Sequence, residues 1–121
     1  MILVDSSVWV DHLRKSDATL ARMLNSERVL AHPFVIGELA LGSLRQREAI
    51  LAALQNLPQA TVADDTEVLR LINQEALHGH GIDYVDAHLL ASARLTADGS
   101  LWTRDKRLHA VAGRLGLAAA L

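Results

Sequence analysis

The sequence predicts an α/β fold: a three-layer α/β/α domain with a short central parallel sheet of four to five strands. Short apolar segments alternate with longer amphipathic segments along all 121 residues, as is typical of a parallel sheet covered by helices on both faces. Half of the residues are hydrophobic, enough for a substantial core. We therefore expect one domain spanning residues 1–121.

Five segments have the character of strands. The first, an apolar run of β type, stops at an Asp-Ser-Ser cluster that suits the start of a helix. The fourth follows an Asp-Gly turn signal at 98–99. The fifth ends the sequence and is expected to be an edge strand. The predicted strands are residues 1–4, 28–31, 59–63, 100–103 and 115–121.

Helices are expected between these strands. Pro33 suits the first turn of a helix, and Asp64-Asp65 opens a segment with Val68 and Leu71 on one face. A Gly-rich break at 78–81 separates that helix from the next. The predicted helices are 8–15, 18–25, 34–44, 45–56 with a bend near 42–43, one opening at 64–65, one from 83 or 84 to 94, and 105–112.

Composition excludes several classes of protein. The chain has no cysteine, so disulfides and thiolate metal sites are excluded, and a reducing cytoplasm is the expected location. We expect no signal peptide and no membrane span. The net charge of −2 argues against a passive nucleic-acid coat protein. It does not argue against an enzyme that acts on nucleic acid through metal ions, since acidic ligands themselves lower the net charge.

Four acidic residues lie in or beside apolar runs: Asp5, Glu38, Asp86 and Asp105. A carboxylate in such a setting is costly unless something positive joins it. Two of the four follow predicted strands, and the other two lie on helices that follow strand-end loops. All four can therefore face one edge of a parallel sheet, which is where ligands bind in such folds.

Carboxylates without histidine or cysteine partners favour hard cations such as Mg²⁺ or Mn²⁺. Four like charges within a few ångströms would repel one another, and a divalent cation removes that penalty. The cation can also generate hydroxide from water and neutralise a transferring phosphate. Metal-assisted hydrolysis of phosphodiesters is the natural reaction class.

The chain also resembles a known family. The runs VDSSV at 4–8, DAHLLASA at 86–93 and LWTRDKRL at 101–108, with the isolated helical Glu38 between the first two, look like the PIN domain. More narrowly, the chain resembles the VapC group of type II toxin–antitoxin ribonucleases. The resemblance covers essentially the whole chain, and the four acids match in order and spacing.

The resemblance implies a role for each of these residues. As catalytic acids it implies Asp5, Glu38, Asp86 and Asp105, of which Asp5, Asp86 and Asp105 bind the metal and Glu38 helps to hold the metal or its water. Ser7 and Thr103 would orient water or carboxylates from a second shell. The implied activity is endonucleolytic cleavage of RNA with Mg²⁺ or Mn²⁺. The implied partners are RNA, an antitoxin that inserts a segment into the active-site groove, and a second copy of the chain in a homodimer.

Simpler roles remain open for each acid. Asp5 and Asp105 could cap the helices that follow them, and Glu38 could pair with an arginine. Asp83 lies one helical turn before Asp86. It could be a helix cap, an acid of the second shell beside Ser7 and Thr103, or, as a weaker candidate than Asp86, the ligand itself. Arg104 and the neighbouring basic residues are expected to be solvated, or to contact RNA phosphates.

Three other functions compete with the nuclease. A phosphoacceptor signalling domain, also doubly wound, could use Asp64 and Asp65, but it needs an acidic pair at the end of strand one. A haloacid-dehalogenase-like phosphatase needs a second Asp where Ser7 stands. An inactive PIN-like binding module would lack one of the four acids, and none is missing.

Overall fold

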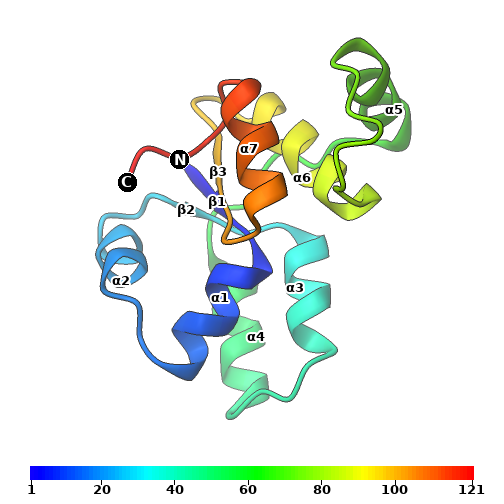
Figure 1. Cartoon of the computed structure of the whole chain (residues 1–121). Helices are drawn as coiled ribbons and strands as arrows, with labels where there is room; N and C mark the ends of the chain where they lie inside the picture. Colours follow the sequence, from blue (N-terminus) through cyan, green and yellow to red (C-terminus); the bar gives the residue numbers. More distant parts are fainter.

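The computed structural model describes all of residues 1–121 and contains a small parallel sheet. Its strands are β1 (Ile2–Val4), β2 (Val29–Leu30) and β3 (Ser100–Trp102). They run in the order β2-β1-β3, with β1 parallel to both neighbours. Figure 1 shows the three strands at the centre with helices around them. The predicted α/β fold with a parallel sheet is confirmed.

The prediction of four to five strands is wrong, because the sheet has three. The segment predicted as a strand at 59–63 forms one isolated bridge, between Ala31 and Gln59. Two of its backbone N–H groups donate hydrogen bonds to side chains instead. The N–H of Thr61 bonds Thr96 Oγ1 (2.9 Å), and the N–H of Ala63 bonds Ser92 Oγ (3.1 Å). These bonds replace the ladder that a strand would need.

The expected edge strand at 115–121 is likewise reduced to one bridge, between Leu101 and Ala118. Gly116 has φ +72°, and the N–H of Leu117 bonds back to the carbonyl of Ala112 at 2.8 Å. The first residues of the segment at 115–121 therefore form the C-terminal cap of the preceding helix. Little chain is then left to pair with β3.

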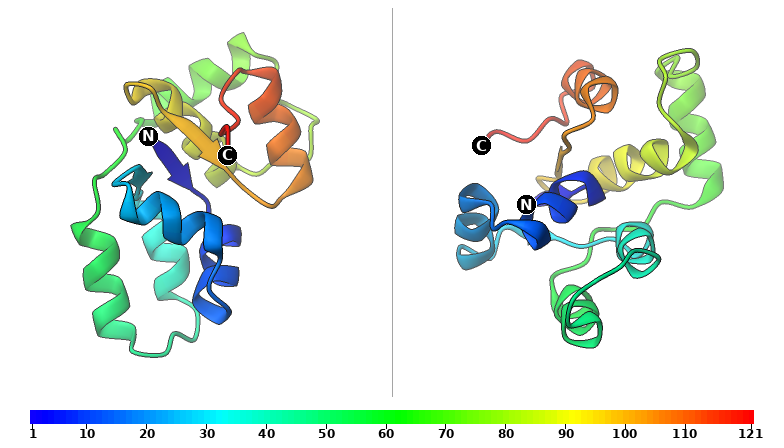
Figure 2. Two further views of the ribbon diagram at one scale, coloured as in Figure 1. Left: turned by 90° about the vertical axis from the view of Figure 1, so that its left-hand side faces the viewer. Right: turned by 60° about the horizontal axis from the view of Figure 1, so that its bottom comes forward.

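Seven helices surround the sheet. They are α1 (Ser6–Arg14), α2 (Ala18–Asn25), α3 (Pro33–Ala40), α4 (Arg47–Asn56), α5 (Asp65–Gln74), α6 (Tyr84–Leu95) and α7 (Lys106–Arg114). Figure 2 shows α2 and α6 on opposite sides of the strands. The bend expected near residues 42–43 is a complete break between α3 and α4. None of the helices combines the length and the apolar character needed to cross a bilayer.

The hydrophobic core is one cluster of 27 buried residues. Its centre is a row of three leucines across the sheet, because Leu3 of β1 pairs with Leu30 on one side and Leu101 on the other. Leu3 and Leu101 are completely buried and Leu30 nearly so. This row anchors β1, the strand that carries Asp5 at its carboxyl end.

Strand order places Asp5 at the point where a ligand is expected. From β1 the chain proceeds to β2 on one side, and β3 later joins on the other side. The helices after β1 and β2 therefore diverge from neighbouring strand ends, which opens a crevice at the carboxyl end of the central strand. Asp5 is the first residue beyond that end.

A buried histidine ties the start of α3 to α6. His32 Nδ1 accepts the N–H of Phe34 at 3.0 Å, and its Nε2 lies 3.0 Å from Ser92 Oγ. The accepting Nδ1 carries no proton, so the hydrogen-bond network assigns the proton to Nε2. Burial first, and then the nearby His88, lower the pKa of His32 to about 4.

This histidine predicts a loss of stability in mild acid. The unfolded chain takes up the proton near the ordinary pKa of 6.5, whereas the folded chain does so only near 4. The contribution of His32 to the free energy of unfolding is therefore fully present above about pH 6.5. It is lost as the pH drops toward 4, by on the order of 3 kcal/mol. We expect His32→Asn, which keeps a capping acceptor, to lose this part of the pH dependence in urea titrations. Identical slopes of unfolding free energy against pH in both proteins would contradict it.

Candidate active site

Asp5 is a buried carboxylate with one oxygen committed and one free. Its Oδ2 accepts hydrogen bonds from Ser7 Oγ and Thr103 Oγ1, both at 2.8 Å, and the residue is only 7% exposed. Asp5 occupies the N-cap position of α1, but its side chain bonds none of the helix N–H groups. The simple capping role is therefore wrong for Asp5, and Oδ1 remains available to a ligand.

The two hydroxyls that hold Asp5 are themselves fixed by the loop after β3. Ser7 Oγ accepts the N–H of Arg104 at 3.0 Å, and Thr103 Oγ1 accepts the N–H of Asp105 at 3.1 Å. Each hydroxyl thus donates its proton to the carboxylate and accepts a backbone proton from the loop. The orientation of Asp5 therefore depends on where residues 103–105 lie.

Asp83 and Asp86 form a reciprocal cap at the start of α6. Asp83 Oδ1 accepts the N–H of Asp86 (2.8 Å), and Asp86 Oδ2 accepts the N–H of Asp83 (3.1 Å). Partial burial, and then the carboxylates of Asp83, Asp5 and Asp105, raise the pKa of Asp86 to about 6. Asp83 therefore acts as a cap, one of its expected roles, and Asp86 as the metal ligand stays a prediction.

Glu38 reaches the same site from the middle of α3. Burial first, and then the carboxylates of Asp5 and Asp83, raise its pKa, while the Ser6 hydroxyl opposes the shift. No lysine, arginine or histidine forms an ion pair with it. The alternative of a salt bridge to an arginine is therefore wrong for Glu38.

Asp105 caps α7, which is one of the two roles expected for it. Its Oδ1 accepts the N–H groups of Arg107 (2.9 Å) and Leu108 (3.0 Å). The same side chain contributes to the raised pKa of Asp86. Capping and membership of the acidic site therefore coexist in Asp105.

The acids gather without any counter-charge. All ion pairs of the protein lie elsewhere and involve His88, Arg94 and Arg104. As the side chains stand, no three of the carboxylates converge as ligands for one ion. Asp83, Asp86 and Asp105 each have one oxygen bonded to a backbone N–H at the start of α6 or α7. One oxygen of each stays free, so the donor set suits a hard divalent cation at modest side-chain adjustment.

Sequence reasoning missed the use that the structure makes of Arg104. Its Nε lies 2.9 Å from Asp11 Oδ2, and its terminal nitrogen lies 2.6 Å from Asp17 Oδ2. These partners stand about 90 residues earlier in the chain, so no local pattern indicates the contact. The one available signal is the spacing of Ser7 and Asp11, which puts them on one face of α1.

Asp64 and Asp65 do not join the acidic site. Asp64 forms a capping box with Glu67 at the start of α5, and Asp65 accepts hydrogen bonds from Tyr84 and lies 3.2 Å from His88 Nε2. Asp64 thus caps α5, and Asp65 ties α5 to α6. The structure therefore gives no support to a phosphoacceptor centre at these residues.

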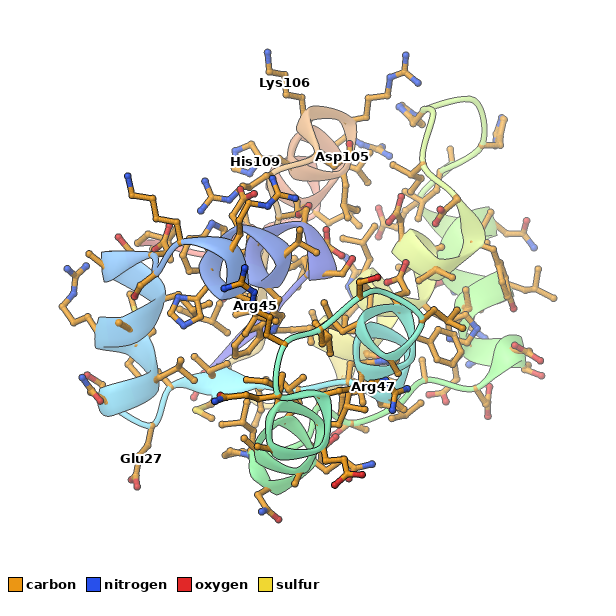
Figure 3. All side chains as sticks on the ribbon, turned by 90° about the horizontal axis from the view of Figure 1, so that it is seen from below. Glu27, Arg45, Arg47, Asp105, Lys106 and His109 are labelled. Atoms are coloured by element: carbon orange, nitrogen blue, oxygen red, sulfur yellow. The ribbon has the colours of Figure 1, made fainter.

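A groove of about 860 Å³ opens beside Glu38, between α1, α3 and the loop leading into α4. Figure 3 views this side of the molecule, with Arg45 near α1 and Lys106 projecting from α7 beside Asp105. The groove is lined by both apolar and polar side chains, among them Ser6, Val10, Leu13, Arg14, Glu38, Leu39, Arg45 and Ile50. The groove is continuous with the acidic site through Ser6 and Glu38.

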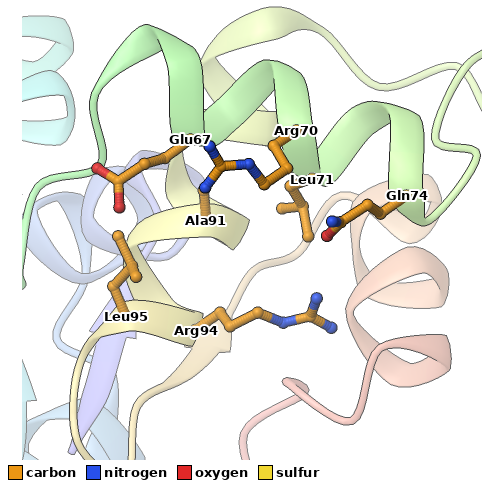
Figure 4. Close-up of a pocket in the computed structure, with 7 residues that line it drawn as sticks. All are labelled: Glu67, Arg70, Leu71, Gln74, Ala91, Arg94 and Leu95. Atoms are coloured by element: carbon orange, nitrogen blue, oxygen red, sulfur yellow. The ribbon is translucent and has the colours of Figure 1, made fainter.

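A second cleft, of about 130 Å³, lies between α5 and α6 and contains none of the four acids (Figure 4). Arg94, which lines it, is paired with Glu75 at 3.2 Å. This cleft is small, and none of the four acids lines it, so it is not part of the site.

The PIN domain family model matches residues 2–114. The chain belongs to the PIN domain family. This PIN domain is also 50% identical, over 120 residues, to Ribonuclease VapC32 of Mycobacterium tuberculosis, in both strain CDC 1551 and strain H37Rv. The similarity covers 99% of this chain and 97% of each relative. Membership of the family excludes the phosphoacceptor and dehalogenase-like alternatives, which belong to other fold families.

Proposed function

We propose that the protein is a metal-dependent endoribonuclease and the toxin of a VapBC-type toxin–antitoxin pair. The single observation that carries the proposal is a set of acids without counter-charge at the carboxyl end of the central strand. Asp5, Glu38, Asp86 and Asp105 come from four separate elements, and two of them have raised pKa values caused partly by the other carboxylates. The 50% sequence identity to a named ribonuclease, over 97% of that relative's length, supports the same activity.

Mg²⁺ or Mn²⁺ is the cation that fits. Asp5, Asp86 and Asp105 would hold it, and Glu38 would hold the ion or its water. When bound, the ion supplies Lewis acidity and a nucleophilic water at neutral pH. The free Oδ1 of Asp5 is the ligand atom with the most constrained position, because Ser7 and Thr103 both bond Oδ2.

The chain's own residues orient the reaction. Ser7 and Thr103 fix the plane of the Asp5 carboxylate, and the caps of α6 and α7 fix Asp86 and Asp105. Attack of water on the RNA phosphodiester needs no covalent intermediate with the protein. The exposed Lys106 and Arg107 follow Asp105 in the chain, and we expect them to contact RNA phosphates.

Close packing restrains Arg107. A side chain at Gly81 would lie 2.7 Å from Arg107 Cδ, and Gly81 has φ +78°. Arg107 therefore lies over the Gly-rich loop that leads into Asp83 and α6, with no carboxylate paired to it. Its charge remains available to RNA.

The partners follow from the same proposal. The groove beside Glu38 is large enough to receive a segment of an antitoxin, and its apolar floor with Arg14 and Arg45 suits an amphipathic segment with acidic residues. We further propose a homodimer, a cytoplasmic location where RNA is made, and a single functional domain over residues 1–121, which the single core cluster supports.

The test is RNA cleavage by the purified protein with Mn²⁺ or Mg²⁺, with EDTA, and with Asp5→Asn. Cleavage of a broad RNA panel that is lost in both EDTA and the variant is the expected result. Asp98→Asn, which alters an exposed turn away from the site, serves as the control. A folded protein that binds no divalent ion and cleaves no RNA would leave the inactive binding module as the better description.

Thr103→Val should weaken the site without unfolding the protein. Valine keeps the shape of threonine but removes the hydroxyl that donates to Asp5 Oδ2. Loss of such an outer hydrogen bond typically costs about 10- to 100-fold in metal affinity or activity. We expect that loss in Mn²⁺ titrations and in cleavage rate, and no comparable loss in Thr66→Val, on the exposed side of α5. Unchanged Mn²⁺ affinity in Thr103→Val would contradict the role of the hydroxyl.

A further inference from the structure

Arg104 stands directly between Thr103 and Asp105, yet its side chain points away from the acids. Its guanidinium binds two carboxylates at once, Asp11 in α1 and Asp17 before α2. A positive charge with two negative partners presents no net attraction to an RNA phosphate. The contact therefore calls for an explanation other than substrate binding.

One of the two partners of Arg104, Asp17, is itself fixed by a helix cap. Asp17 caps α2 through its Oδ1, which accepts the N–H of Leu20 at 2.9 Å, leaving Oδ2 for Arg104. That helix N–H, followed by the guanidinium, holds the pKa of Asp17 below its usual value. Asp11 lies one turn after Ser7 on the same face of α1. Backbone and side chain of Arg104 thus bind α1 at two successive positions along one face.

Two hydrogen bonds connect the position of Arg104 to the acids of the site. The N–H of Arg104 bonds Ser7 Oγ, and the N–H of Asp105 bonds Thr103 Oγ1. Both hydroxyls then donate to Asp5 Oδ2. If the loop shifts along α1, the two hydroxyls lose their acceptor geometry together, and Asp105 moves with them.

We infer that Arg104, clamped by Asp11 and Asp17, is a positioning residue that sets the loop 103–105 on α1 and thereby orients Asp5 and Asp105 for metal binding. The inference rests on the proposed metal site and assigns a purpose to three charged residues outside it. The clamp is formed by arginine because its planar fork serves two carboxylates at once, which a lysine ammonium does less well.

Mn²⁺ binding measured by electron paramagnetic resonance separates positioning from direct RNA contact. Arg104→Gln should weaken Mn²⁺ binding about 10-fold, in the range known for outer residues of metal sites. Asp11→Asn combined with Asp17→Asn should weaken it similarly, because asparagine keeps the α2 cap but releases the guanidinium. Adding Arg104→Gln to that pair should cost little more, since all three changes break one contact. Arg104→Lys should recover part of the loss.

A direct RNA contact predicts the opposite sign for the aspartates. Neutralising Asp11 and Asp17 would then free the guanidinium and tighten RNA binding, while Mn²⁺ affinity stayed at the wild-type value. That pattern would overturn the inference. Lys15→Gln, which removes a charge from the same end of α1 without touching an ion pair, controls for the general change in potential.

Amide hydrogen exchange of the metal-free protein gives a second readout that needs neither metal nor RNA. Arg104→Gln should speed exchange at residues 104 and 105, whose N–H groups bond Ser7 and Thr103, and leave the amides of β1 protected. Unchanged exchange at both positions would also overturn the inference. If the wild type binds no Mn²⁺ while Asp5→Asn behaves identically, the proposed metal site fails instead, and the exchange result still reports on the clamp.

Discussion

Asp86→Asn is expected to abolish most RNA cleavage while making the metal-free protein more stable above about pH 6. The variant removes one metal ligand, so cleavage should fall by about 100-fold or more, beyond the loss typical of outer residues. The Asn side chain still accepts the N–H of Asp83, so the cap of α6 survives. Cleavage assays with saturating Mn²⁺ and thermal melts in EDTA measure the two effects.

The gain in stability follows from the raised pKa of Asp86. Burial and neighbouring carboxylates raise it from 3.8 to about 6, so the folded chain binds a proton more tightly than the unfolded chain between these values. Stability of the metal-free protein therefore falls as the pH rises through that window, and the full penalty applies above it. Asparagine carries no charge and escapes the penalty.

Glu67→Gln is the matched control. Glu67 occupies the same third position of α5 and closes the same kind of capping box with Asp64, but it lies outside the acidic site. We expect unchanged cleavage and no stabilisation at pH 8. A metal-free melting temperature that falls equally in both variants would show that Asp86 acts only as a cap.

Leu3→Ala is expected to cause the largest loss of stability. Leu3 is completely buried between Leu30 and Leu101 at the centre of the sheet. Truncating a buried leucine typically lowers the free energy of unfolding by about 2–5 kcal/mol, a large part of the 5–15 kcal/mol of a typical domain. The melting temperature should fall by on the order of 10 °C.

Leu41→Ala provides the contrast, because Leu41 is 91% exposed. Urea titrations should show a change in unfolding free energy within about 0.5 kcal/mol for this variant. Comparable losses in the two variants would mean that the leucine row is not the centre of the core. Since Leu3 lies two residues before Asp5, Leu3→Ala should also reduce Mn²⁺ affinity.

The parallel α/β fold and the gathering of the acids were predictable because each rests on local signals. Asp5 ends an apolar strand, and Asp105 follows another, so parallel strands bring them to one edge. Glu38 stands between apolar neighbours, where a charge needs a reason. These signals are read from a few consecutive residues, whereas the strand order β2-β1-β3 is known only from the structure.

The number of strands and the support of the site were not predictable in the same way. Residues 59–63 have strand character, but hydroxyls of Ser92 and Thr96 compete for their N–H groups. Arg104 has the sequence context of a surface residue, and its partners become visible only when α1 lies beside β3. Both features depend on side chains that meet across long stretches of chain.

The hydrogen bond from Thr103 to Asp5 joins residues 98 positions apart, and this separation sets an order of events during synthesis. At about 5–20 residues per second, a ribosome needs roughly 5–20 s to pass from one to the other. Throughout that time the nascent chain carries Asp5 without the hydroxyl and the carboxylate that complete its surroundings. Under the proposed function, a chain that terminates before residue 103 lacks the hydroxyl that orients Asp5, so we expect it to cleave no RNA.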